Sequence, residues 1–133
     1  MTNRAVELHD SQVLVTNWDG EDLVLRMSVY LHVTEGRPGW DRGTGCTQDA
    51  DLRVTHGTLI ASPHGSLSIL DGTIQVEERV FSNILPVPFD HHGRVVVAFK
   101  GAEGELHATG TGIALILLGS PVFVEEIPGH DER

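Results

Sequence analysis

The chain has few of the residues on which several protein classes depend. Among its 133 residues there is one cysteine, Cys46, and one lysine. A single cysteine forms no disulfide within the chain, which indicates a reducing compartment. The longest apolar run, residues 113–118, is too short to span a bilayer, and the first residues lack the apolar segment of a secretory signal. We therefore expect a cytoplasmic protein without a membrane-spanning segment.

Positive charge is also scarce. Nine basic residues stand against 19 acidic ones, and the formal net charge is −10. Binding to nucleic acid requires lysine and arginine to replace the counterions of the phosphates, so nucleic acid is not an expected partner. The same argument disfavours anionic membrane surfaces, and the charge favours neutral or cationic partners.

What the chain does contain is a repeated alternation of apolar and polar residues. Hydrophobic residues make up 40% and charged residues 21% of the sequence, as in ordinary globular proteins. Residues 22–34 alternate with a period of two, which is typical of a long strand with one buried face. No segment shows a 3.6-residue period. The other strands we expect are residues 12–18, 52–60, 66–70, 73–80, 94–100, 105–118 and 122–127.

Turn residues separate these segments. Asp19-Gly20, Asp71-Gly72 and residues 101–104 are typical of hairpin turns. About eight short strands joined in this way predict an all-β chain folded as a single antiparallel β-sandwich, with a jelly roll as one form of it. Two prolines exclude residues 85–89 from a central strand, so we expect this segment to cross between sheets. The domain should cover residues 1–127, with a loose tail at 128–133.

The strongest candidate for a binding site is the glycine-rich segment at residues 34–51. It contains turn residues around Trp40, a large amphipathic side chain flanked by Asp41 and Arg42. Tyr30 and His32 lie on the polar side of the preceding strand and extend the candidate surface. Stacking or carboxylate recognition suits these residues better than catalysis. The alternative is a compact Ω-loop whose tryptophan closes one end of the sandwich.

Histidine is frequent, and it raises the possibility of a metal site. Asp90, His91 and His92 are the alternative candidates for ligands of a metal-dependent enzyme, either a hydrolase or a cupin-like protein. A zinc site usually contains a short-spaced pair such as His-x-His, and the sequence has none. We therefore interpret these residues as polar turn residues and expect no metal or cofactor. The eight histidines are His9, His32, His56, His64, His91, His92, His107 and His130.

Three further motifs contain residue types found in catalytic or phosphate-binding sites, but their context does not support such a role. Residues 9–11, His-Asp-Ser, contain the residue types of a hydrolytic triad, but triad members meet from distant positions and the G-x-S-x-G elbow is absent. The glycine pairs at 43–45 and 110–112 match no phosphate-binding motif. Cys46 lacks a nearby cation on a rigid element that would stabilise its thiolate. We predict no catalytic residues.

Three segments carry a resemblance. LHDS at residues 8–11, PGWDRGTG at 38–45 and FVEEIPG at 123–129 are similar to a set of small bacterial proteins of unknown function. The resemblance covers nearly the whole chain and implies a compact stand-alone domain. It carries no catalytic residue to this sequence.

The residues favour a non-catalytic binding or accessory module that uses the Trp40 segment to bind a small molecule or a protein. They also suggest self-association. Residues 113–118 are apolar on both faces, and residues 94–100 are nearly so, which is more than a small sandwich can cover. A two-fold partner is the commonest cover for such a surface, so we expect a homodimer.

Overall fold

A computed structural model describes residues 2–129 and shows a chain built of strands. No helix occurs in these residues, as the missing 3.6-residue period predicted. Of the tail expected at 128–133, only Pro128 and Gly129 lie within the described residues. The strands are β1 (Asn3–Asp19), β2 (Asp22–Thr34), β3 (Gly43–Thr55), β4 (Thr58–Ala61), β5 (Leu67–Ser68), β6 (Asp71–Val76), β7 (Arg79–Ser82), β8 (Ile84–Val87), β9 (Asp90–Gly101) and β10 (Gly104–Ile127).

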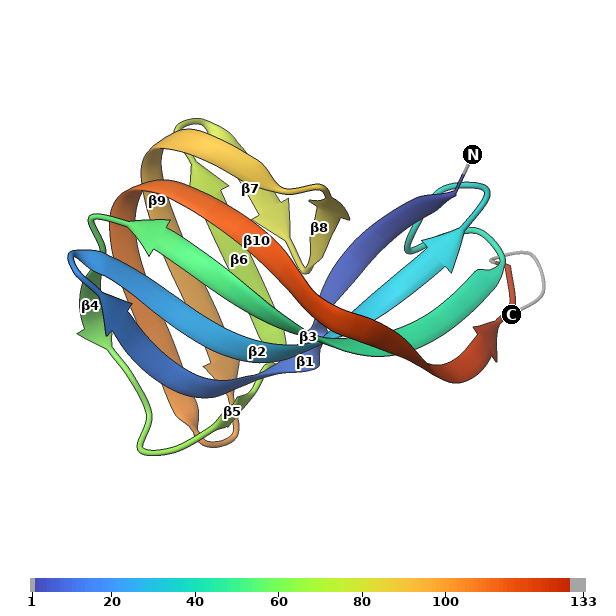
Figure 1. Cartoon of the computed structure of the whole chain (residues 1–133), viewed down its shortest axis with the longest axis horizontal. Helices are drawn as coiled ribbons and strands as arrows, with labels where there is room; N and C mark the ends of the chain where they lie inside the picture. Colours follow the sequence, from blue (N-terminus) through green and yellow to red (C-terminus); the bar gives the residue numbers. More distant parts are fainter. Residues whose placement is uncertain (1, 130–133) are drawn as a thin grey trace.

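The strands form one antiparallel sheet that curls into a half-barrel (Figure 1). Its order is β5-β1-β2-β3-β10-β9-β6-β7, with β4 beside β10 and β8 beside β1. The all-β class is thus confirmed, whereas the layering expected of a sandwich is corrected to a single curled sheet. Alternation in the sequence reveals a buried face, but it does not reveal whether that face packs against a second sheet or against distant strands of its own sheet.

Four strands continue beyond the half-barrel as a narrower extension, which we call the arm (Figure 1). In the arm each strand pairs with its neighbour in the order β1-β2-β3-β10, and β8 pairs with the outer side of β1. The loop at residues 35–42 closes its far end. The arm comprises residues 3–8 of β1, 28–34 of β2, 43–48 of β3 and 122–127 of β10.

A bulge lies where β1 leaves the arm for the half-barrel. The pairing of β1 with β2 shifts register between Glu7 and Gln12. Ser11 is buried there; its hydroxyl donates to the Glu7 carbonyl at 2.8 Å and accepts from the Tyr30 amide at 3.0 Å. The side chain thus supplies bonds that the interrupted ladder lacks. His9 and Asp10 lie on the surface beside it, so residues 9–11 stabilise a bulge and form no triad.

Asn83 joins the two sides of the curl. Its backbone carbonyl accepts from the Leu8 amide of β1, and its own amide donates to the Gly72 carbonyl of β6. Its side chain accepts from the Gly72 amide and donates to Asp71. With φ at +63°, Asn83 adopts the left-handed region that asparagine tolerates better than most residues.

Several segment boundaries differ from the predictions. Strand β2 and the hairpins at Asp19-Gly20 and 101–104 are confirmed, but β1 begins nine residues earlier than residue 12. The segment at 34–51 is largely strand, because β3 begins at Gly43. The two strands expected at 105–118 and 122–127 are one, β10, with a register shift after Leu118. The predicted crossover at 85–89 contains β8, which pairs only with β1.

Asp71-Gly72 is the clearest error among the predicted turns. Both residues lie in β6, where Gly72 pairs with Phe99 of β9. A β-carbon at Gly72 would lie 3.1 Å from the Cβ of Leu8 and 3.1 Å from a ring carbon of Phe99. The glycine leaves room for the close approach of Leu8 from β1 and Phe99 from β9. A sequence does not distinguish this need from that of a turn.

Candidate functional site

The loop at residues 35–42 is tied to the strands that carry it. Thr34 ends β2, and its hydroxyl donates to the Arg42 carbonyl and accepts from the Gly36 amide. From β1, the Asn3 side chain donates to the Gly36 carbonyl at 2.7 Å. These bonds satisfy the backbone at both ends of the loop, which fixes its position on the arm.

Asp41 stabilises the interior of the loop. Its carboxylate accepts from the Arg37 amide, and its own amide donates to the Arg37 carbonyl at 2.9 Å. A β-carbon at Gly36 would overlap this carboxylate, so the turn closes only with glycine there. The predicted site residue Asp41 therefore holds the loop in shape.

Trp40 remains on the surface of this fixed loop. Its side chain is 43% exposed, and the guanidinium carbon of Arg37 lies 4.6 Å from the centre of a tryptophan ring. The contact is a cation–π pair, which holds both side chains in place. Arg37 was not among the predicted site residues, although its spacing of three residues before Trp40 in a turn was the available signal.

His32 lies beneath the loop and is 1% exposed. Its Nδ1 accepts from the Gly39 amide at 2.5 Å, so the imidazole proton must be on Nε2. Gly39 has φ at +84°, and His32 stabilises this left-handed turn directly before Trp40. The predicted surface position of His32 is therefore corrected: the side chain supports the loop from below and offers no surface to a ligand.

Tyr30 lies on the same side of β2 but further from the tip. Its hydroxyl donates to the Glu125 carboxylate of β10 at 2.6 Å, and its ring covers Gly45 of β3. Burial, and then the hydrogen bond and charge of Glu125, raise the pKa of Tyr30 above its ordinary value near 10. Tyr30 and Glu125 line a 400 Å³ hollow together with Glu7, His9 and Asp10. Glu125 was missed because it lies 95 residues after Tyr30, and no local pattern shows that the two strands come together.

A second hollow adjoins the loop itself and has a volume of about 670 Å³. Thr34, Glu35, Asp41 and Arg42 line one part of it, and Thr44 and Glu126 line another. The structure thus brings Asp41 and Arg42 to this hollow and Tyr30 to its neighbour on the arm. Both volumes are in the range of small-molecule sites.

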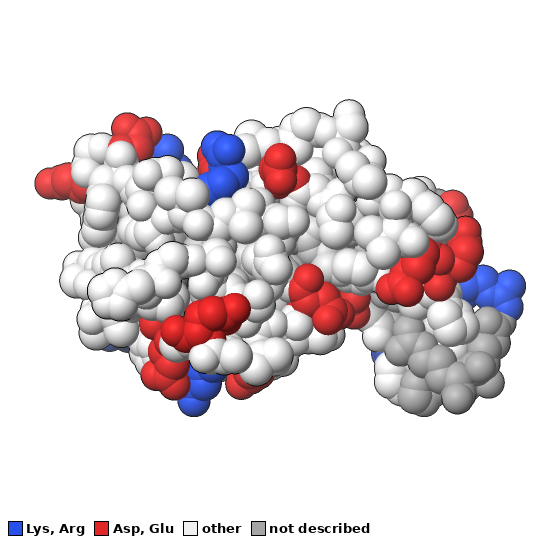
Figure 2. All heavy atoms as spheres, turned by 90° about the horizontal axis from the view of Figure 1, so that it is seen from below, with Lys and Arg blue, Asp and Glu red and all other residues white. Residues whose placement is uncertain are grey.

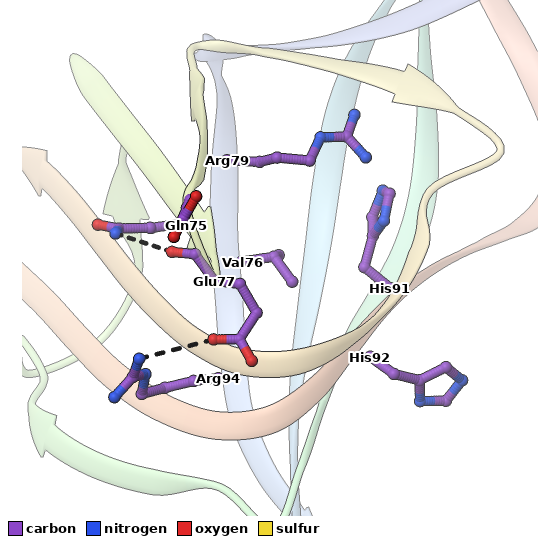
Figure 3. Close-up of a pocket in the computed structure, with 8 residues that line it drawn as sticks. Gln75, Val76, Glu77, Arg79, His91, His92 and Arg94 are labelled. Atoms are coloured by element: carbon purple, nitrogen blue, oxygen red, sulfur yellow. Dashed lines mark hydrogen bonds and ion pairs between the residues drawn. The ribbon is translucent and has the colours of Figure 1, made fainter.

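The alternative metal ligands lie elsewhere, at the start of β9. His91 and His92 line a hollow of about 750 Å³ between β9 and the β6–β7 turn, which we call the Arg79 hollow (Figure 3). The His92 ring points away from His91 in this view, and Asp90 is not part of the lining. Within residues 2–129, no group of three or more His, Cys, Asp or Glu side chains could hold a metal ion.

Comparison with known proteins gives no relative from which a role could be transferred. No family model matches the chain, and no curated protein or solved structure is significantly similar to it. Across residues 2–129, there is no helix of the length and apolarity needed to cross a membrane. The arm and its loop therefore have to be interpreted from their own geometry.

Proposed function

We propose that this protein is a non-catalytic binding module and that the tip of the arm is its binding surface. The observation that carries the proposal is the exposure of Trp40 on a loop whose backbone is fixed by hydrogen bonds. A rigid loop that presents a large aromatic side chain loses little conformational entropy on binding. Exposed aromatic and arginine side chains are also the residues that most often dominate binding energy.

The predicted polar residues support this role as positioning groups. His32, Asp41 and Tyr30 each use a side-chain polar atom to hold the arm or its loop together. Contact with the partner is then made by Trp40 at the surface, with the Arg37 guanidinium held against its ring. Such a separation between residues that position a loop and residues that contact the ligand is typical of a recognition site on a rigid scaffold.

The charge of the arm favours a neutral or cationic partner. Glu7, Asp10, Glu125 and Glu126 line the hollow around Tyr30. Acidic side chains gather on the arm in the view from below, where few basic ones are seen (Figure 2). Together with the net charge of −10, this field attracts cations and repels anions.

Tryptophan fluorescence provides a direct test. The chain has two tryptophans, and Trp18 lies at the β1–β2 hairpin away from the arm tip. A Trp18→Phe variant therefore leaves Trp40 as the only indole. We expect saturable changes in its emission on titration with one or more members of a panel of neutral and cationic metabolites and a lysine-rich peptide.

The matched pair Trp40→Ala and Trp18→Ala separates binding from folding. Trp18 is 53% exposed and Trp40 43%, so each truncation should cost about 1–2 kcal/mol, less than the 3–5 kcal/mol typical of a buried aromatic. Only Trp40→Ala should abolish a ligand-induced thermal shift. Equal shifts in both variants would exclude the arm tip, and a loss of 3–5 kcal/mol on Trp40→Ala alone would favour the structural-plug alternative.

A cytoplasmic location remains part of the proposal. It is supported by Cys46, which is half-buried and unpaired in the strand β3. A reducing compartment keeps such a thiol in the free form. Fractionation of cells that express the chain would test this directly.

A further inference from the structure

The Arg79 hollow differs from the rest of this acidic protein in its chemistry. It lies between the β6–β7 turn and the start of β9, and Val76 forms part of its lining. Its lining includes two arginines and two histidines: Arg79, Arg94, His91 and His92. The whole chain has nine basic residues and eight histidines. Its volume of about 750 Å³ is ample for a small molecule.

Arg79 is held in place but has no carboxylate partner among the described residues. Its guanidinium carbon lies 4.9 Å from the centre of the Phe81 ring. Other arginines of the chain are paired: Arg26 with Asp51 at 2.6 Å and Arg53 with Asp19 at 2.7 Å. The N–H groups of Arg79 are therefore oriented by a ring and available to an incoming acceptor.

His91 lies against the same ring. Its imidazole centre is 5.4 Å from that of Phe81 and 4.8 Å from that of the buried Phe89. No side-chain hydrogen bond of His91 occurs within residues 2–129. In Figure 3 the Arg79 guanidinium and the His91 ring lie toward one another across the hollow. Two donors are thus fixed on one aromatic support.

Two carboxylates, Glu77 and Glu78, also line the hollow, and among the described residues neither forms an ion pair with Arg79. Glu77 lies 3.7 Å from Arg94, and the Gln75 side chain donates to the Glu77 backbone carbonyl at 3.0 Å (Figure 3). A β-carbon at Gly93 would lie 2.7 Å from Glu77 Cγ, so the strand packs closely against this side chain. Glu77 therefore faces Arg94 and leaves the donors of Arg79 and His91 to a ligand.

We propose that the Arg79 hollow is a second binding site that takes the carboxylate or phosphate group of a small molecule. The guanidinium of Arg79 would donate to two oxygens of the anion. The imidazole N–H of His91 would donate a third hydrogen bond to one of the anion's oxygens. The site is independent of the arm tip, which favours neutral or cationic partners. The chain would then bind ligands of different charge at two separate sites, which share no lining residue.

An NMR titration tests the proposal with simple anions. Two titrations are run, one with inorganic phosphate and one with acetate. In each, the anion replaces chloride at constant pH and ionic strength, and backbone amide chemical shifts are recorded. We expect saturable shifts at residues 75–79 and 91–94 with a millimolar Kd. Saturation by phosphate alone assigns a phosphate group, by acetate alone a carboxylate, and by both a general oxyanion site. Saturation by neither overturns the proposal.

Three variants complete the test. Arg79→Gln should weaken binding about tenfold or more, because a charge-assisted bidentate contact is lost. His91→Phe keeps the ring contacts with Phe81 and Phe89 but removes the N–H, and it should also weaken binding. Lys100→Gln removes the same charge at an exposed position outside the hollow and should leave the Kd unchanged. Equal weakening in Arg79→Gln and Lys100→Gln would show general charge attraction and overturn the site.

Discussion

Several side chains in the arm occupy space that glycine leaves free. The Tyr30 ring covers Gly45, and the Nε2 atom of His32 would lie 3.0 Å from a β-carbon at Gly43. Both glycines belong to β3, and both polar rings belong to the facing side of β2. Aromatic rings that cover strand glycines restore the packing that the missing side chain would have supplied. The glycines that made residues 34–51 resemble a loop are thus required inside a sheet.

Tyr30 gives a prediction that can be observed with one chromophore, because it is the only tyrosine of the chain. Burial and the hydrogen bond to Glu125 raise its pKa in the folded protein. Absorbance at 295 nm should therefore show ionisation well above pH 10 in native protein and near pH 10 in urea. Ionisation near pH 10 in both would show that the Tyr30–Glu125 contact does not form in solution.

The same shift has a consequence for stability. Above about pH 10 the unfolded tyrosine releases its proton while the folded one retains it, so the free energy of unfolding should fall as pH rises. Below pH 10 both states keep the proton, and this contribution is fully present. Tyr30→Phe should remove this part of the pH dependence, as urea unfolding at pH 9 and pH 11 would show.

At the residue scale, the sequence indicated which side chains are polar or aromatic better than it indicated which of them are exposed to solvent. Trp40 was selected for its size and its turn context, and its side chain is exposed. His32 was placed correctly on the polar face of β2, yet it is buried. Its cover comes from the Gly39 turn, which folds back over the strand. Alternation within one strand contains no information about such a loop.

At the scale of elements, the two sides of the curl depend on a small connection. Asn83 bonds to β1 through its backbone and to β6 through both backbone and side chain, although it belongs to no strand. A side-chain amide that accepts and donates at once reproduces part of a strand ladder. The curl is further connected by β5, where Ser68 pairs with Gln12, and by Leu70 just after it, whose amide donates to the Lys100 carbonyl.

Asn83→Gly should isolate the contribution of that side chain. Glycine tolerates the positive φ of this position, so the variant removes the amide without adding backbone strain. The Gly72 amide loses its partner, and we expect a loss of about 1–3 kcal/mol in urea unfolding. Asn17→Gly offers a comparison at an exposed position of β1. If both variants lose the same amount, the cost reflects glycine alone and Asn83 has no special role.

The ends of a strand were predictable where the same face of the strand is buried along its whole length. Strand β2 was predicted to the residue because every second residue from 23 to 33 is apolar, and the turn at 101–104 is short and mostly small or polar. Strands β1 and β10 were divided or shortened because bulges change which face is buried along them. A bulge reverses the parity of the pattern, so a continuous strand reads as two segments or as a strand and a loop.

At the scale of the whole molecule, the local sequence pattern predicted the fold class, whereas the shape depends on which strands pair. Alternation and missing helical period sufficed for an all-β assignment. The single curled sheet depends on pairs far apart in the sequence, such as β1 with β8 and β3 with β10. No local signal specifies these partners. The arm follows from the same pairings, because four strands extend past the point where the others end.

The structure of one chain leaves apolar side chains exposed along one edge. Beyond Ala114, β10 pairs with β3 on one side and with no strand of the described residues on the other. Ile116, Val122, Phe123 and Val124 are each 44% or more exposed along that stretch. An unpaired edge with apolar side chains favours pairing with another chain. This is the surface on which the predicted homodimer would form, with the edges of two copies of β10 facing each other about a two-fold axis.

Light scattering at micromolar concentration measures the assembly directly. We expect about twice the chain mass of 14.5 kDa. Phe123→Glu places a charge on the edge, beside Glu125 and Glu126, and should shift the mass to that of a monomer. Leu70→Glu makes the same change at a residue of the half-barrel that is 67% exposed, and it should leave the dimer intact. A mass near 14.5 kDa for the unaltered chain, unchanged on dilution, would exclude the dimer, and equal dissociation by both variants would exclude the β10 edge as its interface.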